Sequence, residues 1–193
     1  MTIQSNKDHF KSLISEAKQK YDGLDKRIKD EIDSMLDLYL YNRVSRIDKC
    51  ESPIEQLLHI HLSELCTELI NELLYLSENS NLIYKLQEEV VVKHKTYRVD
   101  FLITCQVDEK NYHFAIECDG HDFHEKTKEQ AARDKSRDRE LASIGYRVIR
   151  FTGSEIWNAP TKCVIEISDI IQEATGISEY WNKRIEEDNR AFN

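Results

Sequence analysis

Apolar residues recur at helical spacing through the first part of the chain. Stretches 5–20 and 24–46 show this spacing, and Gly23 lies between them. A third helix is predicted to begin after Ser52, because Ser-Pro-Ile-Glu supplies an N-cap, a proline at the first helical position and a capping-box glutamate, Glu55. Its apolar stripe predicts a core helix and consists of Ile54, Leu57, Leu58, His61, Leu65, Leu69, Leu73 and Leu76.

The pattern then changes from helical spacing to strand-like runs. Segments 83–92, 97–106 and 111–118 are rich in β-forming residues, and a turn is predicted at 108–111. A charged helix at 125–144 and a strand at 146–151 follow. Thr152-Gly-Ser-Glu155 is expected to cap a further helical turn, before helices at 161–174 and 178–190. The order from Ser52 is αβββαβ followed by helices, which predicts an α/β fold.

Length and composition are those of a folded chain, with 193 residues, 40% apolar residues, five Gly and two Pro. We expect a helical N-terminal extension (1–51), a core (52–157) and C-terminal helices packed on that core (158–193). No apolar run approaches the roughly 18 residues of a membrane span, and the N-terminus lacks the apolar core of a signal peptide. A cytoplasmic protein without membrane contact is therefore expected. Five cysteines without a C-x-x-C pair predict reduced thiols.

The formal net charge of −9 is unevenly distributed along the chain. Residues 51–90 carry −7, whereas residues 121–150 carry +2. Because the local field of one face steers a charged partner, this acidic balance does not exclude a phosphate-bearing one. It does argue against indiscriminate coating of DNA.

Three acidic residues are predicted to share one face of a β-hairpin. Glu117 and Asp119 lie two apart on a strand, and Asp100 lies on the preceding strand. A hairpin turning about 108–111 pairs positions that sum to 219, which sets Asp100 opposite Asp119 and Leu102 opposite Glu117. Like charges at this spacing need a counter-ion, and oxygen ligands favour Mg²⁺ or Mn²⁺. The alternative is a solvated acidic strand end beside a glycine turn.

The whole arrangement resembles the PD-(D/E)xK nuclease superfamily, over about residues 52–157. The stretches that carry the resemblance are Val99-Asp-Phe-Leu-Ile103, Ile116-Glu-Cys-Asp-Gly-His-Asp-Phe-His124, Arg133-Asp-Lys-Ser-Arg-Asp-Arg139 and Gly145-Tyr-Arg-Val-Ile-Arg-Phe151. They are similar to the branch related to very short patch repair endonucleases. The resemblance implies a restriction-endonuclease-like αβββαβ core, with a central mixed sheet flanked by helices.

The same resemblance implies roles for individual residues. Asp100 and Glu117 would bind the metal, with the Cys118 carbonyl as a further ligand and Glu55 in support, although capping already explains Glu55. Asp119 stands where most members of the superfamily carry lysine. Asp119 would then bind a second metal ion or hold a bridging water. No residue is thereby assigned to the lysine's role in activating water.

Two histidines and a basic helix follow the acidic residues. His124 is the preferred candidate for water activation, with His121 in support; the alternatives are a zinc site or plain surface histidines. Basic side chains of the next helix and strand are expected to contact phosphates, although a solvated, salt-bridged helix is the alternative. These expected nucleic-acid contacts are Lys126, Lys128, Arg133, Arg137 and Arg150.

The sequence therefore predicts a Mg²⁺- or Mn²⁺-dependent phosphodiesterase acting on nucleic acid, most simply a DNA endonuclease of restriction, repair or defence type. The competing hypothesis is a catalytically inactive module that keeps the nuclease fold for nucleic-acid binding or protein assembly. Binding of a divalent metal distinguishes the two. The N-terminal helices are expected to serve as a homodimer or partner-protein surface.

Overall fold

The structure, a computed structural model, describes residues 3–120 and 128–191. It forms two compact units, Met1–Asn42 and Arg43–Asn193. Helices α1 (Ile3–Asp22) and α2 (Lys26–Val44) confirm the first two predicted helices. Exposed apolar side chains of α2 include Met35, Leu38 and Tyr41, and their use as a partner surface stays a prediction, as do the predicted borders at residues 51 and 157. Within the described ranges, no helix combines the length and the apolar character needed to cross a membrane.

Helix α3 (Pro53–Leu76) begins as its sequence predicts. The Ser52 side chain accepts a hydrogen bond from the Glu55 backbone N–H, and Pro53 occupies the first turn. The buried face differs from the predicted stripe at the histidines. His61 is only half-buried, whereas His59 is fully buried and bonds to the Tyr84 hydroxyl (2.9 Å) and the Ser45 carbonyl (3.0 Å). Because α3 packs against both the sheet and another helix, more than one stripe of it is buried.

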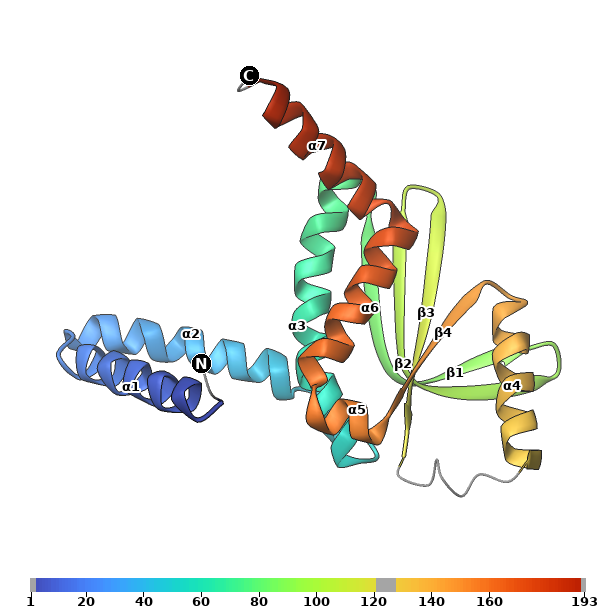
Figure 1. Cartoon of the computed structure of the whole chain (residues 1–193), viewed down its shortest axis with the longest axis horizontal. Coiled ribbons are helices and arrows are strands. Elements are labelled where there is room, and N and C mark those ends of the chain that lie inside the picture. The colour runs from blue at the N-terminus through green and yellow to red at the C-terminus, as the bar shows by residue number, and fades with distance from the viewer. Residues whose placement is uncertain (1–2, 121–127, 192–193) are drawn as a thin grey trace. The chain divides into compact units, whose positions relative to one another are not determined.

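Four strands form one mixed sheet in the order β1-β2-β3-β4, which confirms the predicted α/β class (Figure 1). The first three strands pair antiparallel, and β4 pairs parallel with β3 after the crossover through α4. Gly145, with φ of 88°, ends that crossover. The elements after α3 are β1 (Asn81–Val92), β2 (Lys95–Val107), β3 (Lys110–Asp119), α4 (Lys128–Ala142), β4 (Tyr146–Thr152), α5 (Gly153–Asn158), α6 (Pro160–Thr175) and α7 (Ile177–Ala191).

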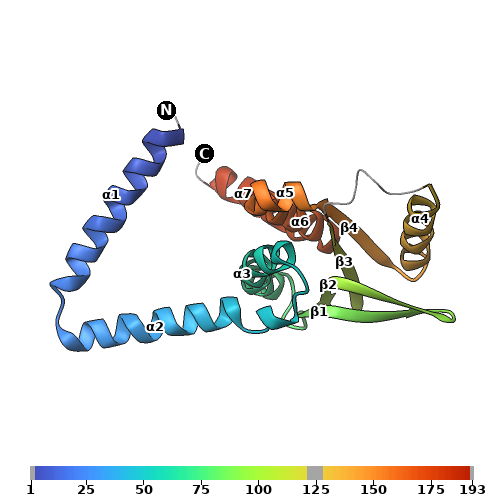
Figure 2. The ribbon, with the colours of Figure 1, turned by 90° about the horizontal axis from the view of Figure 1, so that it is seen from below.

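Helices cover the sheet on both faces (Figure 2). On one face, Phe101, Ile103 and Phe114 pack with buried residues of α3 and α6 in the larger core cluster. On the other face, Leu102 and Leu141 belong to a smaller cluster that joins the sheet to α4. All five cysteines are free thiols, as expected, and four of them are buried.

The β2–β3 hairpin has the odd position sum that the shared acidic face requires, but the predicted sum of 219 is wrong. Phe101 pairs with Ile116 and Val107 with Lys110, so paired positions sum to 217. The strands run closer to the turn than predicted, because Asp108 adopts a φ of 52° and the connection needs only Asp108 and Glu109. A shift of two residues preserves the faces. Extended by one pair, this register sets Asp100 opposite Glu117.

The β1–β2 pair is irregular at Gln87 and Asp100. Leu86 pairs with Phe101 and Glu88 with Val99, but the intervening pair is absent from the ladder and Gln87 has a φ of 51°. The register is the same on both sides of this gap, so no residue is inserted, and the left-handed backbone of Gln87 interrupts the ladder.

Thr152 and Glu155 form the capping box that the sequence predicts at the start of α5. Thr152 Oγ1 accepts from the Glu155 backbone N–H (3.3 Å), and Glu155 Oε2 accepts from the Thr152 backbone N–H (2.8 Å). We expect Thr152→Ala to lower the free energy of unfolding by about 1 kcal/mol, the usual loss for a cap. Thr152→Ser keeps the hydroxyl and is the matched control in urea unfolding. Equal losses in both variants would contradict the capping role.

Candidate active site at the β2–β3 strand ends

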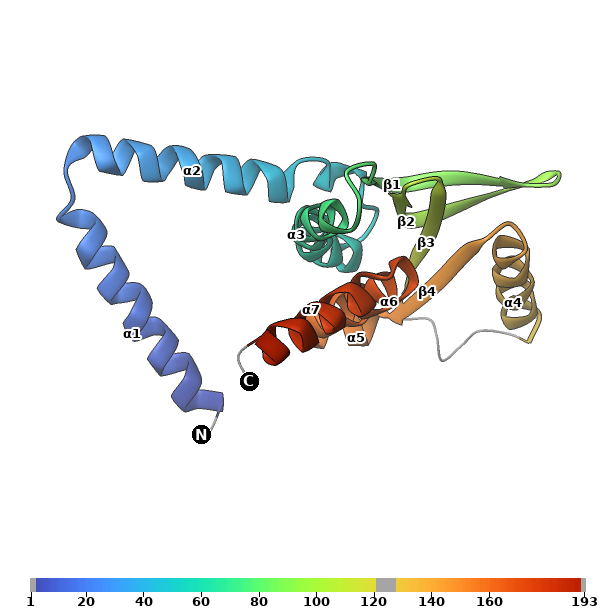
Figure 3. The ribbon, with the colours of Figure 1, turned by 90° about the horizontal axis from the view of Figure 1, so that it is seen from above.

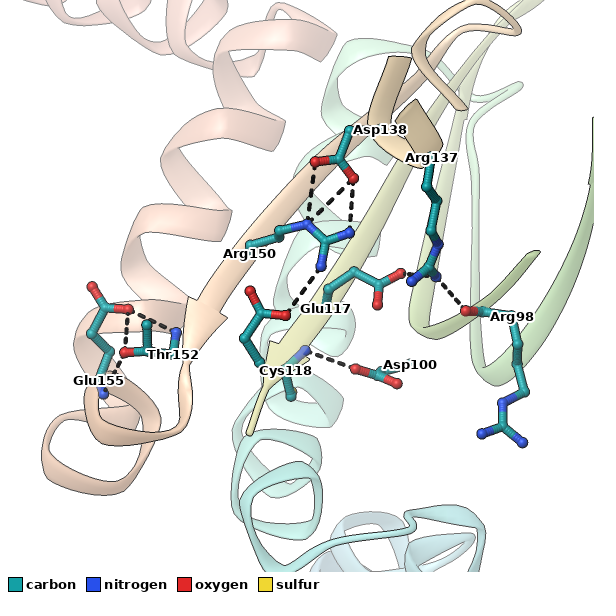
Figure 4. Close-up of polar contacts among 10 residues, drawn as sticks. Arg98, Asp100, Glu117, Cys118, Arg137, Asp138, Arg150, Thr152 and Glu155 are labelled. Carbon is teal, nitrogen blue, oxygen red and sulfur yellow. Dashed lines mark hydrogen bonds and ion pairs between the residues drawn. The ribbon is translucent and has the colours of Figure 1, made fainter. Parts of the chain in front are cut away.

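Asp100 and Glu117 lie next to each other where β2 and β3 leave their shared ladder. The Cys118 backbone N–H donates to Asp100 Oδ2 (2.7 Å), which fixes the aspartate across the strand pair (Figure 4). Glu117 is buried and Asp100 is half-buried. The predicted pair of acids is therefore assembled by the sheet itself.

Arg137 brings a guanidinium from α4 onto Glu117. Its Nη2 donates to Glu117 Oε1 at 2.5 Å and also to the Arg98 carbonyl oxygen (Figure 4). The guanidinium carbon lies 5.8 Å from the centre of the Tyr97 ring. Within the described part of the chain, the buried Arg137 Nε has no hydrogen-bond partner. The sequence assigned Arg137 to phosphate contact; the structure places it among the acids.

Arg150 brings a second guanidinium from β4. Glu117 and Arg150 are direct neighbours in the parallel β3–β4 register. Arg150 Nη1 lies 3.1 Å from Asp119 Oδ1, and its Nη2 lies 2.8 Å from Asp138 Oδ1. Asp119 thus holds the Arg150 guanidinium beside Glu117. The assignment of Asp119 as a metal ligand stays a prediction.

Glu55 reaches the same site from the start of α3. Its Oε2 accepts from the Glu51 backbone N–H and from Gln87 Nε2, both at 2.8 Å. The Gln87 side chain also acts on Asp100, where it opposes the rise in pKa of that carboxyl, and so links the helix start to the catalytic candidates. The sequence did not reveal Gln87. It alternates with Lys85 and Glu89, so it looks like one more residue of a solvated strand face.

The acids repel one another in a poorly solvated place. Burial raises the pKa of Glu117 to about 7, and the negative charges of Asp100 and Asp119 raise it as well, against the opposing effects of Arg137 and Arg150. Burial also raises the pKa of Asp100, and the charge of Glu55 adds to that rise. The carboxylates of the site therefore outnumber the two guanidiniums that neutralise them. These carboxylates are Glu55, Asp100, Glu117 and Asp119.

The oxygen atoms of this site suit a hard divalent cation, although Asp100 and Glu117 each already accept a hydrogen bond. Carboxylate oxygens of Asp100 and Glu117 are typical Mg²⁺ or Mn²⁺ ligands. The amide oxygen of Gln87 is buried without a hydrogen-bond partner among the described residues. Within those residues, no three His, Cys, Asp or Glu side chains are arranged to hold a metal ion. Arg137 binds one of the two Glu117 carboxylate oxygens, Oε1.

The remaining predicted residues are spread along and before α4. His121, His124 and Lys126 lie outside the described residues, and Lys128 is described only as the first residue of α4. Arg133 is exposed on α4. The part of the site that would activate water thus rests on the sequence alone.

A comparison with known families matches the part of the chain that contains Asp100 and Glu117. The model of a restriction endonuclease-like family, REase_MTES_1575, matches residues 80–171, which run from β1 into α6. The match supports a restriction endonuclease-like domain and indicates a nuclease-type function on nucleic acid. Neither the curated proteins nor the solved structures gave a match. Membership of the PD-(D/E)xK superfamily and of its very short patch repair branch stays a prediction.

The raised pKa of Glu117 predicts how stability depends on pH in EDTA. The folded protein holds this proton more tightly than the unfolded chain, so the free energy of unfolding should fall as pH rises from 4.5 through about 7. Glu117→Gln removes the titrating group and should flatten this part of the profile. Thermal unfolding in a pH series measures both slopes. Parallel slopes for the variant and the wild type would contradict the assignment of the titration to Glu117.

Proposed function

We propose that the protein is a metal-dependent DNA endonuclease with its active site at Asp100 and Glu117. The observation that carries this proposal is the position of the two carboxylates, which are side by side, poorly solvated and electrostatically strained. The restriction endonuclease-like match over the same strands supports it.

Asp100 and Glu117 would hold a Mg²⁺ or Mn²⁺ ion, with the Cys118 carbonyl as the expected third ligand and Gln87 and Glu55 orienting Asp100. When bound, the ion supplies positive charge that acidifies a water and neutralises the leaving oxygen. Arg137 bonds to one of the two Glu117 oxygens, so it would share this carboxylate with the ion or release it. Once released, Arg137 would be available to bind a phosphate, which is the role that the sequence predicted for it.

Arg150 has a different part in this proposal. Asp119 and Asp138 hold it from two sides, so its guanidinium stays beside Glu117 as a fixed positive charge. A guanidinium cannot act as a base near neutral pH. It can stabilise the charge of a phosphate whose scissile bond lies over the two acids.

Substitution of either acid should abolish cleavage and leave the fold intact. Glu117→Gln and Asp100→Asn keep the size of each side chain and remove one negative charge. We expect loss of Mg²⁺-dependent cleavage across a panel of labelled DNA and RNA substrates, with cooperative unfolding retained. Glu109→Gln, at the exposed β2–β3 turn, is the matched control and should cut at the wild-type rate. Wild-type cleavage by Glu117→Gln would refute the site.

Metal binding separates this function from the inactive-module hypothesis. The enzyme should bind Mn²⁺ with low micromolar affinity in a titration without nucleic acid, and Glu117→Gln should lose that binding. A wild-type protein that is insensitive to Mn²⁺ in both binding and thermal stability would favour the module instead.

His124 is proposed as the group that orients or deprotonates the water, on the basis of its sequence position and its pKa range. His124→Ala should lower turnover about 10²-fold or more, the usual size of an acid–base contribution. Lys126→Ala should mainly weaken binding and reduce its salt dependence. Equal, small effects of both substitutions would exclude His124 from this role.

A further inference from the structure

The β1–β2 hairpin extends beyond the rest of the sheet as a two-stranded arm, which we define as residues 88–99. Strand β2 pairs with β3 only from Phe101 to Val107, whereas β1 and β2 continue to pair as far as Val92 and Lys95. The views of Figures 1, 2 and 3 agree that the arm projects beside α4 and away from α3. Its tip is the two-residue turn Lys93-His94.

The arm has one buried face and one exposed face. Its buried face carries Val90, Val92 and Val99, which pack with Leu141 of α4. This packing makes the arm a supported element, and Glu140 of α4 adds hydrogen bonds from Lys95 (2.6 Å) and Tyr97 (2.7 Å). The exposed face therefore keeps a defined direction relative to α4 and the acids.

The exposed face carries one pair of small side chains with methyl groups and one pair of opposite charges, next to the lysine at the tip. Its paired residues are Val91 with Thr96 and Glu89 with Arg98. Val91 is 66% exposed although it lies in a strand with buried valines on either side of it. Lys93 at the tip has a φ of 58°, a conformation that Gly or Asn adopts at lower cost.

The net charge of the arm and the neighbouring helix α4 is opposite in sign to that of the whole chain. The arm (88–99) and α4 (128–142) together contain eight Lys and Arg against six Asp and Glu, in a chain whose net charge is −9. These two elements therefore carry a small positive balance, with Lys95, Arg98 and Arg137 in ion pairs with Glu140, Glu51 and Glu117. A polyanion would meet this part of the protein first, because the local field steers encounter.

We propose that the arm enters the major groove of a B-form DNA duplex, with Lys93 at a phosphate and Val91 and Thr96 against base edges. This inference rests on the proposed nuclease function and names its substrate class. A two-stranded β-ribbon fits the major groove of B-DNA, and exposed methyl groups complement the thymine methyl. The major groove of an RNA duplex is too deep and narrow for such an element.

The base of the arm connects directly with the proposed active site. Asp100 directly follows the arm, and the Arg98 carbonyl accepts from the same Arg137 that binds Glu117. At about 3.3 Å per residue, the tip lies about 20 Å from Asp100 along the strand, less than one turn of DNA. One duplex is therefore long enough to contact the tip and reach the region of the acids.

Binding to DNA tests the arm without requiring cleavage. Fluorescence anisotropy would be measured on the full chain in EDTA, with a labelled DNA duplex, the matching RNA duplex and the single strand. Lys93→Gly removes the charge and relaxes the backbone, so its melting temperature should equal or exceed that of the wild type. Its affinity for duplex DNA should fall about tenfold at 0.1 M salt, and its salt slope by about 1.

Lys110→Glu is the matched control, because Lys110 is an exposed lysine at the other hairpin tip of the same sheet. The wild type should prefer duplex DNA to duplex RNA, and the control should keep that preference and affinity. The inference is overturned if Lys93→Gly binds duplex DNA as well as the wild type does, if Lys110→Glu loses as much affinity, or if RNA duplexes bind equally well. Retained Glu117-dependent cleavage alongside any of these results would leave the proposed function standing.

Discussion

The central constraint on this structure is the buried negative charge of Asp100 and Glu117, at the point where β2 and β3 stop pairing. Asp100 and Glu117 are brought together by the strand register, and burial raises the pKa of both. Uncompensated carboxylates in such a place would oppose folding, because desolvation penalises their charged forms. Arg137 from α4 and Arg150 from β4 supply the compensation. The crossover that completes the sheet is therefore also the segment that balances its charge.

The charge balance gives a structural role to Asp119, at a position where most members of the superfamily that the sequence resembles carry lysine. Asp119 and Asp138 together hold Arg150 beside Glu117, so a positive charge reaches this region from β4 rather than from β3. A lysine at position 119 would face that guanidinium and repel it. An aspartate at position 119 is thus consistent with an arginine at position 150 on the neighbouring strand.

The same residues connect the two elements that the proposed function uses. The Arg98 carbonyl, the Arg137 guanidinium and the Glu117 carboxylate form a continuous chain from the arm to the acids. Gln87 forms a second connection, because it donates to Glu55 at the start of α3 and acts on the pKa of Asp100 at the base of the arm. A cation bound at the acids would compete with Arg137 for Glu117, and a phosphate would compete with Glu117 for Arg137, so either would act on the contact at the arm's base. Binding at the arm and chemistry at the acids are expected to influence each other for this reason.

Local chemistry allowed the sequence alone to predict the helices, the strands and the odd register of the acidic hairpin. Ser52 and Thr152 cap helices through residues three positions away, and alternation along β3 sets Glu117 and Asp119 on one face. The tertiary structure decided what depends on distant residues or on backbone geometry. Asp108 adopts a left-handed conformation that shortens the turn. The resulting register sets Asp100 opposite Glu117, and not opposite Asp119 as the sequence predicted. Gln87, Arg137 and Arg150 enter the site from three other elements, and no pattern within any one of those segments encodes that meeting.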